Sequence, residues 1–384
     1  MDNLSKLFEE NYIEGLPENI VENLNYINNF VIEIICKRLY EIGKLESSYD
    51  IAQLKNALEY AGIDLKIIEE KIAEITQKNI EEIDKIFEET AKENIDFANT
   101  FYKYRGLAEL KSYKDNPKLV KLVESIKNQS MKDYKNISKT RGFLVNGKFS
   151  TIRQQYISIV DKGITAVTTG TMDYNTAIRN AVVNMVDSGV RTVEFESGYS
   201  RRMDSQVRMN VLEGVRRLNM EMLDITSKEF GADGYEITAH SLCAPDHREI
   251  QGRQYSKEAY EKLNKDLKRP IGTLNCKHIA IPIIIGVSSS TYTDKELDKI
   301  IDNSNKEVIY DDKVYTRYEA SQRQRKLETK IRKEKEKLQA FEILKDEVQI
   351  KKSKDKIKEL TKLYKDFSKE VGLSTYPEKL RIYK

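Results

Sequence analysis

Two long stretches of this 384-residue sequence, one near its start and one at its end, repeat apolar residues every three or four positions. That spacing is the period of an α-helix with one buried side. In residues 17–104, Pro17 lies early and Gly43 near the end of a first helix, and the rhythm continues after Gly62. The apolar positions of the first helix are Ile20, Leu24, Ile27, Val31, Ile34 and Ile35. We predict several helices with short breaks, with Cys36 as a core residue.

From about Tyr318 the chain is highly charged and again has the helical period. Its apolar stripe is narrow. The positions are Leu327, Ile331, Leu338, Phe341 and Val348, then Ile357, Leu360, Tyr364, Phe367 and Val371. A narrow stripe predicts contact with a neighbouring helix. That neighbour is either the other half of the same segment, in an antiparallel hairpin, or another subunit, in a coiled coil.

The middle of the chain has shorter signals. FLVNGKFS places Asn-Gly between two apolar runs, which predicts a β-hairpin, and VIYDDKVYT predicts another. RTVEFES, GYEITAH and IAIPIII are strand candidates. Two amphipathic helices separate them: Asp173 suits the N-cap of the first, Gly189 ends it, and Gly231 ends the second.

These patterns predict an α+β fold that is predominantly α-helical. We divide it into an acidic helical bundle or docking arm (1–134), a small α+β module (135–310), and a basic charged helical hairpin or coiled coil (311–384).

Charge is distributed unevenly along the chain. Residues 1–100 carry 10 basic and 22 acidic side chains, whereas residues 311–384 carry 22 basic and 14 acidic ones. This polarity suits docking onto charged partners, and the basic end suits non-specific contact with DNA. Solvated faces of long helices explain the same charges.

Nothing in the sequence indicates a membrane protein or a secreted one. No stretch approaches the roughly 20 apolar residues of a membrane span. The first residues lack the basic and apolar regions of a signal peptide, and three cysteines are too few for a disulfide framework. We expect a protein made in the cytoplasm, with no membrane partner.

Five of the six histidines and cysteines lie within 39 residues: His240, Cys243, His247, Cys276 and His278. Structural zinc takes four nitrogen or sulfur ligands, often from two close pairs. His247 with His240 or Cys243, followed by Cys276-x-His278, supplies two such pairs, although Cys-x-His is tighter than the usual spacing. The window is therefore either a zinc site or a hydrogen-bonded turn.

Enzymatic interpretations have less support. The window partly matches the metal site of HNH nucleases, but Asn275 and His278 are too close in sequence to act from separate elements. Glu194 and Glu196 match the Glu-x-Glu of ADP-ribosyltransferases, a pattern that is more typical of a solvated strand face. Phosphate-binding Gly-Lys loops, G-x-S-x-G and H-E-x-x-H do not occur. We expect no enzyme, no catalytic residue and no small-molecule substrate.

Three motifs occur in the order ITAHSLCAPDHREIQGRQYS, LNCKHIAIPIIIGVS and YTRYEASQRQRKLETKIRKEKEKL. Together they resemble the phage minor capsid proteins, relatives of Mu-type head morphogenesis proteins of tailed phages and of prophages in Gram-positive bacteria. The resemblance covers roughly residues 135–375. The matching positions are His240, His247, Gln251, Gly252, Arg253, Ser256, Asn275, Cys276, Lys277, His278, Pro282, Gly286, Gln324, Arg325 and Glu328.

The chain departs from this family pattern near the first motif. Ala244 stands where the family usually has Arg, Ile250 stands where it has Trp, and Cys243 is not a family position. The resemblance therefore favours His240, His247, Cys276 and His278 as ligands if a metal binds, with Cys243 as a local addition.

The resemblance implies a structural virion protein that is made in the host cytoplasm and resides in the phage head. Family members are low-copy proteins of the portal vertex that aid head assembly and, in some phages, DNA packaging or delivery. The implied partners are the portal protein and other head proteins. If the His/Cys window binds a metal, the cofactor we expect is a structural zinc ion, and we expect no other cofactor. Some relatives carry C-terminal toxin domains, but after residue 318 this chain has only charged helix.

Overall fold

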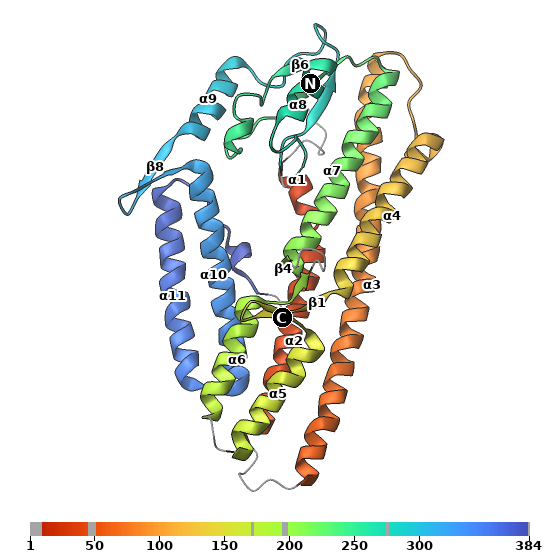
Figure 1. Cartoon of the computed structure of the whole chain (residues 1–384). Coiled ribbons are helices and arrows are strands. Elements are labelled where there is room, and N and C mark those ends of the chain that lie inside the picture. Colours follow the sequence, from red (N-terminus) through yellow and green to blue (C-terminus); the bar gives the residue numbers. More distant parts are fainter. Residues whose placement is uncertain (1–9, 45–50, 170–172, 194–198, 274–275, 383–384) are drawn as a thin grey trace. The chain divides into compact units, whose positions relative to one another are not determined.

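The structure is a computed structural model that describes residues 10–44, 51–169, 173–193, 199–273 and 276–382 (Figure 1). It is mostly helical, with small antiparallel sheets, which confirms the predicted fold class. The helices are α1 (Glu10–Gly15), α2 (Glu18–Gly43), α3 (Ile51–Tyr104), α4 (Pro117–Lys139), α5 (Ile152–Thr169), α6 (Tyr174–Ser188), α7 (Met203–Glu229), α8 (Lys257–Asp266), α9 (Asp294–Asn305), α10 (Arg317–Leu344) and α11 (Glu347–Glu370). The strands are β1 (Arg141–Val145), β2 (Lys148–Thr151), β3 (Arg191–Val193), β4 (Ser200–Arg202), β5 (Gly234–Ile237), β6 (Gln254–Ser256), β7 (Ala280–Ile283), β8 (Glu307–Tyr310) and β9 (Lys313–Thr316). No helix in these ranges is both long and apolar enough to cross a membrane.

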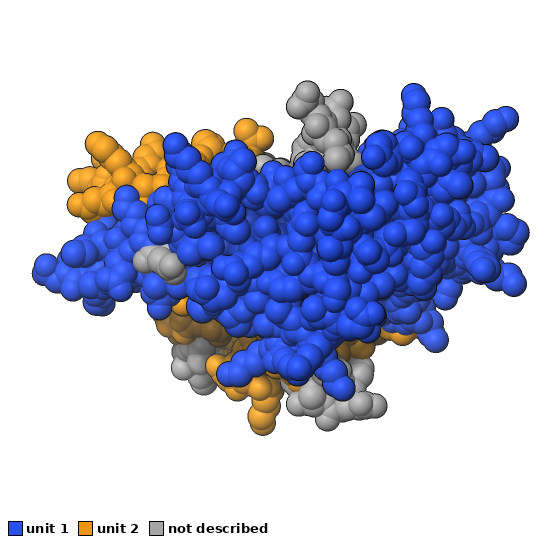
Figure 2. Space-filling view, turned by 90° about the horizontal axis from the view of Figure 1, so that it is seen from above, with its two compact units in different colours: residues 1–19, 80–133, 208–323 blue, residues 20–79, 134–207, 324–384 orange. Residues whose placement is uncertain are grey.

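The chain forms two compact units, coloured separately in Figure 2. Unit 1 consists of residues 1–19, 80–133 and 208–323, and unit 2 of residues 20–79, 134–207 and 324–384. Each unit draws on all three of the segments named from the sequence, so the domain boundaries after residues 134 and 310 stay predictions.

The long helix α3 differs from the expectation of short breaks. It runs unbroken for 54 residues, and Gly62 lies inside it. A lone glycine costs only about 1 kcal/mol relative to alanine within a helix. Buried residues on either side of it, such as Ala61 and Leu65, keep this face of the helix packed. Cys36, on α2, is fully buried as predicted.

Unit 2 contains the four-stranded sheet β2-β1-β3-β4. The predicted hairpin is confirmed as β1–β2, and its turn residues Asn146 and Gly147 both have positive φ, at 50° and 73°. Asn-Gly favours this turn because both residues tolerate the left-handed region. Asp173 caps α6 as predicted, since its carboxylate accepts a hydrogen bond from the Thr176 amide at 2.8 Å.

The C-terminal helices α10 and α11 pack against each other within the chain, which settles the choice between a hairpin and an intermolecular coiled coil (Figure 1). Gln324 donates to the Ser368 hydroxyl at 2.9 Å, and the Tyr364 hydroxyl donates to Glu328 at 3.3 Å. Phe367, fully buried, anchors the same face of α11.

Unit 1 contains the three-stranded sheet β6-β5-β7 and the predicted hairpin β8–β9. Strand β5 is central and pairs antiparallel with both neighbours. Beside it lies a small apolar core made by Ile237, Tyr260, Ile271 and Ala280. This sheet positions the histidine and cysteine cluster.

Candidate metal centre

Strands β5 and β7 bring the two halves of the His/Cys window together. Ile237, the last residue of β5, pairs with Ala280, the first of β7, and the Thr238 amide donates to the Ile279 carbonyl at 3.0 Å. His278 therefore lies beside the chain as it leaves β5. His247 returns to the same place on a short 3₁₀ turn, Pro245–His247.

Gly252 closes the turn that carries His247. Its amide donates to the Ile237 carbonyl at 2.7 Å, and its φ is +69°. A Cβ at this position would collide with the side chain of Leu297. Only glycine fits such a backbone beside so close a neighbour, which gives a physical reason for the glycine in the first motif.

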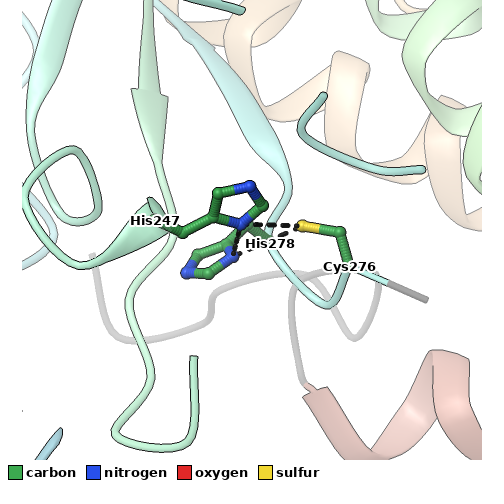
Figure 3. A group of neighbouring side chains, drawn as sticks. All are labelled: His247, Cys276 and His278. Carbon is green, nitrogen blue, oxygen red and sulfur yellow. Dashed lines mark hydrogen bonds between the residues drawn. The ribbon is translucent and has the colours of Figure 1, made fainter. Parts of the chain in front are cut away.

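Three ligand atoms converge at the cluster (Figure 3). The Nδ1 atoms of His247 and His278 are 3.3 Å apart, and the Cys276 Sγ lies 3.5 Å from the first and 3.4 Å from the second. His247 is 2% exposed and His278 is 1% exposed, while Cys276 is partly buried and packs on the apolar core. The three atoms form a nearly equilateral triangle inside the protein.

The outer nitrogen of each imidazole has a fixed partner. His247 Nε2 lies 2.7 Å from the Arg269 carbonyl oxygen, and His278 Nε2 lies 3.0 Å from Gln251 Oε1. The His240 amide also donates to Gln251 Oε1, at 3.0 Å, which identifies that atom as the amide oxygen. Both partners are acceptors, so each Nε2 carries a proton and donates it.

These hydrogen bonds determine what the inner nitrogens can do. A neutral imidazole has one donor and one acceptor nitrogen, so in neutral rings both Nδ1 atoms present lone pairs, to each other and to Cys276. The Cys276 thiol has a single proton and can satisfy one of them. An unsatisfied buried lone pair is unfavourable, and the triangle therefore favours a proton or a cation at its centre.

The pKa values follow from this geometry. Burial, with His240 and His247 nearby, lowers the pKa of His278 to about 2. Burial alone would lower the pKa of His247, but its contacts with Cys276 outweigh burial and raise it. Burial would raise the pKa of Cys276, but the hydrogen bond with His247 lowers it. Cys276 is thus held toward the thiolate, the form that binds metals.

The other two predicted ligands lie outside the triangle. The His240 ring is tilted by 32° against the His278 ring, with 4.4 Å between ring centroids, and its nitrogens are not among the atoms that converge within the described residues. Cys243 is 2% exposed, and its thiol contacts the Ser304 hydroxyl. Asn275, Glu194 and Glu196 lie outside the described residues.

Two supporting residues were not predicted as part of the site. Gln251 was noted only as a motif position, and the ring it orients is that of His278, 27 residues away, so sequence spacing gave no signal for this role. Arg269 acts through its backbone carbonyl, which no side-chain pattern reveals. The Arg269 guanidinium forms an ion pair with Asp246, next to His247.

Comparison with known proteins matches residues 8–369 to a family model described as phage minor capsid protein 2. No curated protein and no solved structure matches the chain. The family match covers nearly the whole sequence, including all three motifs and the triangle. The chain therefore belongs to the phage minor capsid protein 2 family and is a structural protein of the phage capsid.

Proposed function

We propose that this minor capsid protein acts without catalysis at the portal vertex of the phage head, where it supports head assembly. The observation that carries the non-catalytic part is the burial of both histidines of the triangle. His247 and His278 are almost fully buried, and each outer nitrogen is already hydrogen-bonded inside the protein. A general base must reach its substrate, and neither ring offers a nitrogen at the surface.

Docking to a portal or another head protein is supported by the β8–β9 hairpin. Ile309 and Val314 lie directly opposite each other on it and are 68% and 56% exposed. A two-stranded hairpin is marginal in water by itself, and an exposed apolar pair on it suits contact with a protein partner.

The docking test uses co-expression of the tagged chain with the portal and major capsid proteins, followed by isolation of portal-containing particles. We expect the chain in these particles at low copy number. Ile309→Asp with Val314→Asp should reduce its incorporation at least tenfold without changing its thermal unfolding. Val348→Asp, on α11 and 55% exposed, is the matched control. Particles with a normal portal but without the unaltered chain would contradict the proposal.

Contact with DNA is a second proposed role, favoured by α11. All eight of its lysines are exposed: Lys351, Lys352, Lys354, Lys356, Lys358, Lys362, Lys365 and Lys369. Lysine–phosphate contacts are independent of base sequence and weaken with salt. We expect weak, salt-sensitive binding to duplex DNA that is lost when Lys351, Lys352 and Lys354 are replaced by Glu. Absent or salt-insensitive binding would leave α11 with a protein-docking role only.

A further inference from the structure

We propose that His247 Nδ1, His278 Nδ1 and Cys276 Sγ bind one zinc ion, which clasps the turn after β5 to the segment before β7. The distances fit such an ion. Zinc lies about 2.0–2.1 Å from nitrogen and about 2.3 Å from sulfur, so a tetrahedral centre separates two nitrogens by about 3.3–3.4 Å and a nitrogen and the sulfur by about 3.5–3.6 Å. The observed separations are 3.3 Å for the nitrogens and 3.4 and 3.5 Å for the mixed pairs.

A zinc ion would also satisfy the lone pairs that face one another in the triangle. The outer hydrogen bonds leave Nδ1 of both neutral rings without a proton, and both atoms point at the Cys276 sulfur. Without a metal, the Cys276 thiol supplies the single proton in the triangle. That proton can satisfy one of the three contacts between Nδ1 of His247, Nδ1 of His278 and the sulfur. A divalent cation at the centre accepts all three lone pairs at once.

The surroundings resemble the outer shell of a zinc site. Metal-bound histidines usually donate their other N–H to a carbonyl or carboxylate, which sets the ring's orientation. His247 does so to the Arg269 carbonyl and His278 to the Gln251 side chain. Asp246, ion-paired with Arg269, holds the segment that carries this carbonyl.

Two imidazoles and a thiolate favour zinc over magnesium or calcium, which prefer oxygen ligands. Three protein atoms leave one tetrahedral position, which we assign to a water molecule, so this site differs from closed structural sites with four protein ligands. His240 remains stacked on His278 and outside the ligand set. The clasp does not depend on the portal role, since a chain that fails to bind the portal can still bind zinc.

The test measures metal in the full-length protein by elemental analysis after dialysis against equimolar zinc. We expect about one zinc per chain, a lower melting temperature after chelation, and recovery with zinc but not with magnesium. Cys276→Ser should reduce the bound zinc to under about 0.1 per chain. Cys243→Ser and His240→Asn should each retain it.

Cobalt substitution of the unaltered chain supplies a readout that does not depend on whether a variant folds. A thiolate-to-cobalt charge-transfer band together with tetrahedral ligand-field bands would support the site. Absence of bound metal, or binding without a thiolate band, would overturn it. Loss of zinc in His240→Asn or Cys243→Ser would overturn the three-residue ligand set.

Discussion

The β5–β7 module of unit 1 and the α10–α11 pair of unit 2 are held together by different means. The module has strands of three or four residues and a buried apolar core of four side chains. The pair has helices of 28 and 24 residues, with buried apolar side chains on both, such as Ile331 on α10 and Phe367 on α11. In the module three ligand-type atoms meet at one point, whereas the buried apolar side chains of the helical pair are spread along two long helices.

The difference shows where each region can fail. Removing one apolar side chain from a helical pair leaves a cavity. The unfolding free energy that is lost comes from the contacts of that one side chain. Removing one atom of a three-atom cluster disturbs every other atom of that cluster. We therefore expect metal removal and acid to change the stability of the module. We expect the loss of a buried side chain to change the stability of the helical pair.

The largest effect on the helical pair should come from Phe367→Ala. Phe367 is fully buried, and deleting such a ring costs about 3–5 kcal/mol of unfolding free energy. Urea unfolding followed by circular dichroism measures the loss, with Val348→Ala as an exposed control on the same helix. Bound zinc should not change. A Phe367→Ala protein that loses zinc together with its stability would show that the two regions do not respond independently.

Acid should destabilise the module once metal has been removed. His278 has a pKa of about 2 in the folded protein, against about 6.5 when unfolded, so the unfolded chain takes up the proton first. Stability should fall as pH drops below about 6.5, by about 2 kcal/mol at pH 5. The pKa of His247 is raised in the folded protein, so its contribution has the opposite sign, and the fall of about 2 kcal/mol applies to His278 alone.

Unfolding free energies of the chelated protein at pH 7, 6 and 5 measure this effect. His278→Asn should remove the part of the slope that His278 causes. An unchanged slope in that variant would assign the acid sensitivity to other groups.

Replacing Gln251 should weaken the clasp without removing a ligand. Gln251→Leu deletes the acceptor of the His278 Nε2 proton, and loss of such a partner lowers metal affinity by about 10–100-fold. Competition with a chromophoric chelator measures the affinity. Gln129→Leu, which removes an exposed hydrogen bond to Asp133 on α4, is the control. Equal affinities for the two variants would mean that Gln251 does not orient the ring.

The smallest effect should come from the ion pair between Arg179 and Asp346 in unit 2. Arg179 lowers the pKa of Asp346, so the pair stabilises the fold above the unfolded carboxyl's pKa of about 3.9 and loses that stabilisation as pH falls. The two side chains are 32% and 14% exposed, and Asp346→Asn should cost under about 1 kcal/mol at pH 7. Thermal unfolding measures this loss of stability. A loss of several kcal/mol would show that the ion pair contributes more than a partly exposed pair should.

The helices, the two hairpins and the Asp173 cap could be predicted because their signals are local. Asn146-Gly147 specifies its turn by itself, and the stripe through Leu360 and Phe367 specifies a helix with one partner. Strands β4 and β6 were missed because three-residue strands rich in polar side chains carry no period.

The sequence predicted which stretch holds the candidate site, but not which three side chains of that stretch converge. Sequence proximity brought His240 and Cys243 into the predicted set, whereas the pairing of Ile237 with Ala280 decides which side chains converge. The role of the Arg269 carbonyl depends on chain geometry alone. The boundaries of units 1 and 2 could not be read from segments of uniform composition, because each unit combines three separate stretches.

Hydrogen exchange of the full-length protein, with zinc and after chelation, tests most directly whether the module depends on a metal clasp. We predict that peptides covering β5 and β7 lose protection on chelation and regain it with zinc, while peptides covering α11 remain unchanged. Equal protection of β5 and β7 in both states, or an equal loss over β5, β7 and α11, would contradict the account.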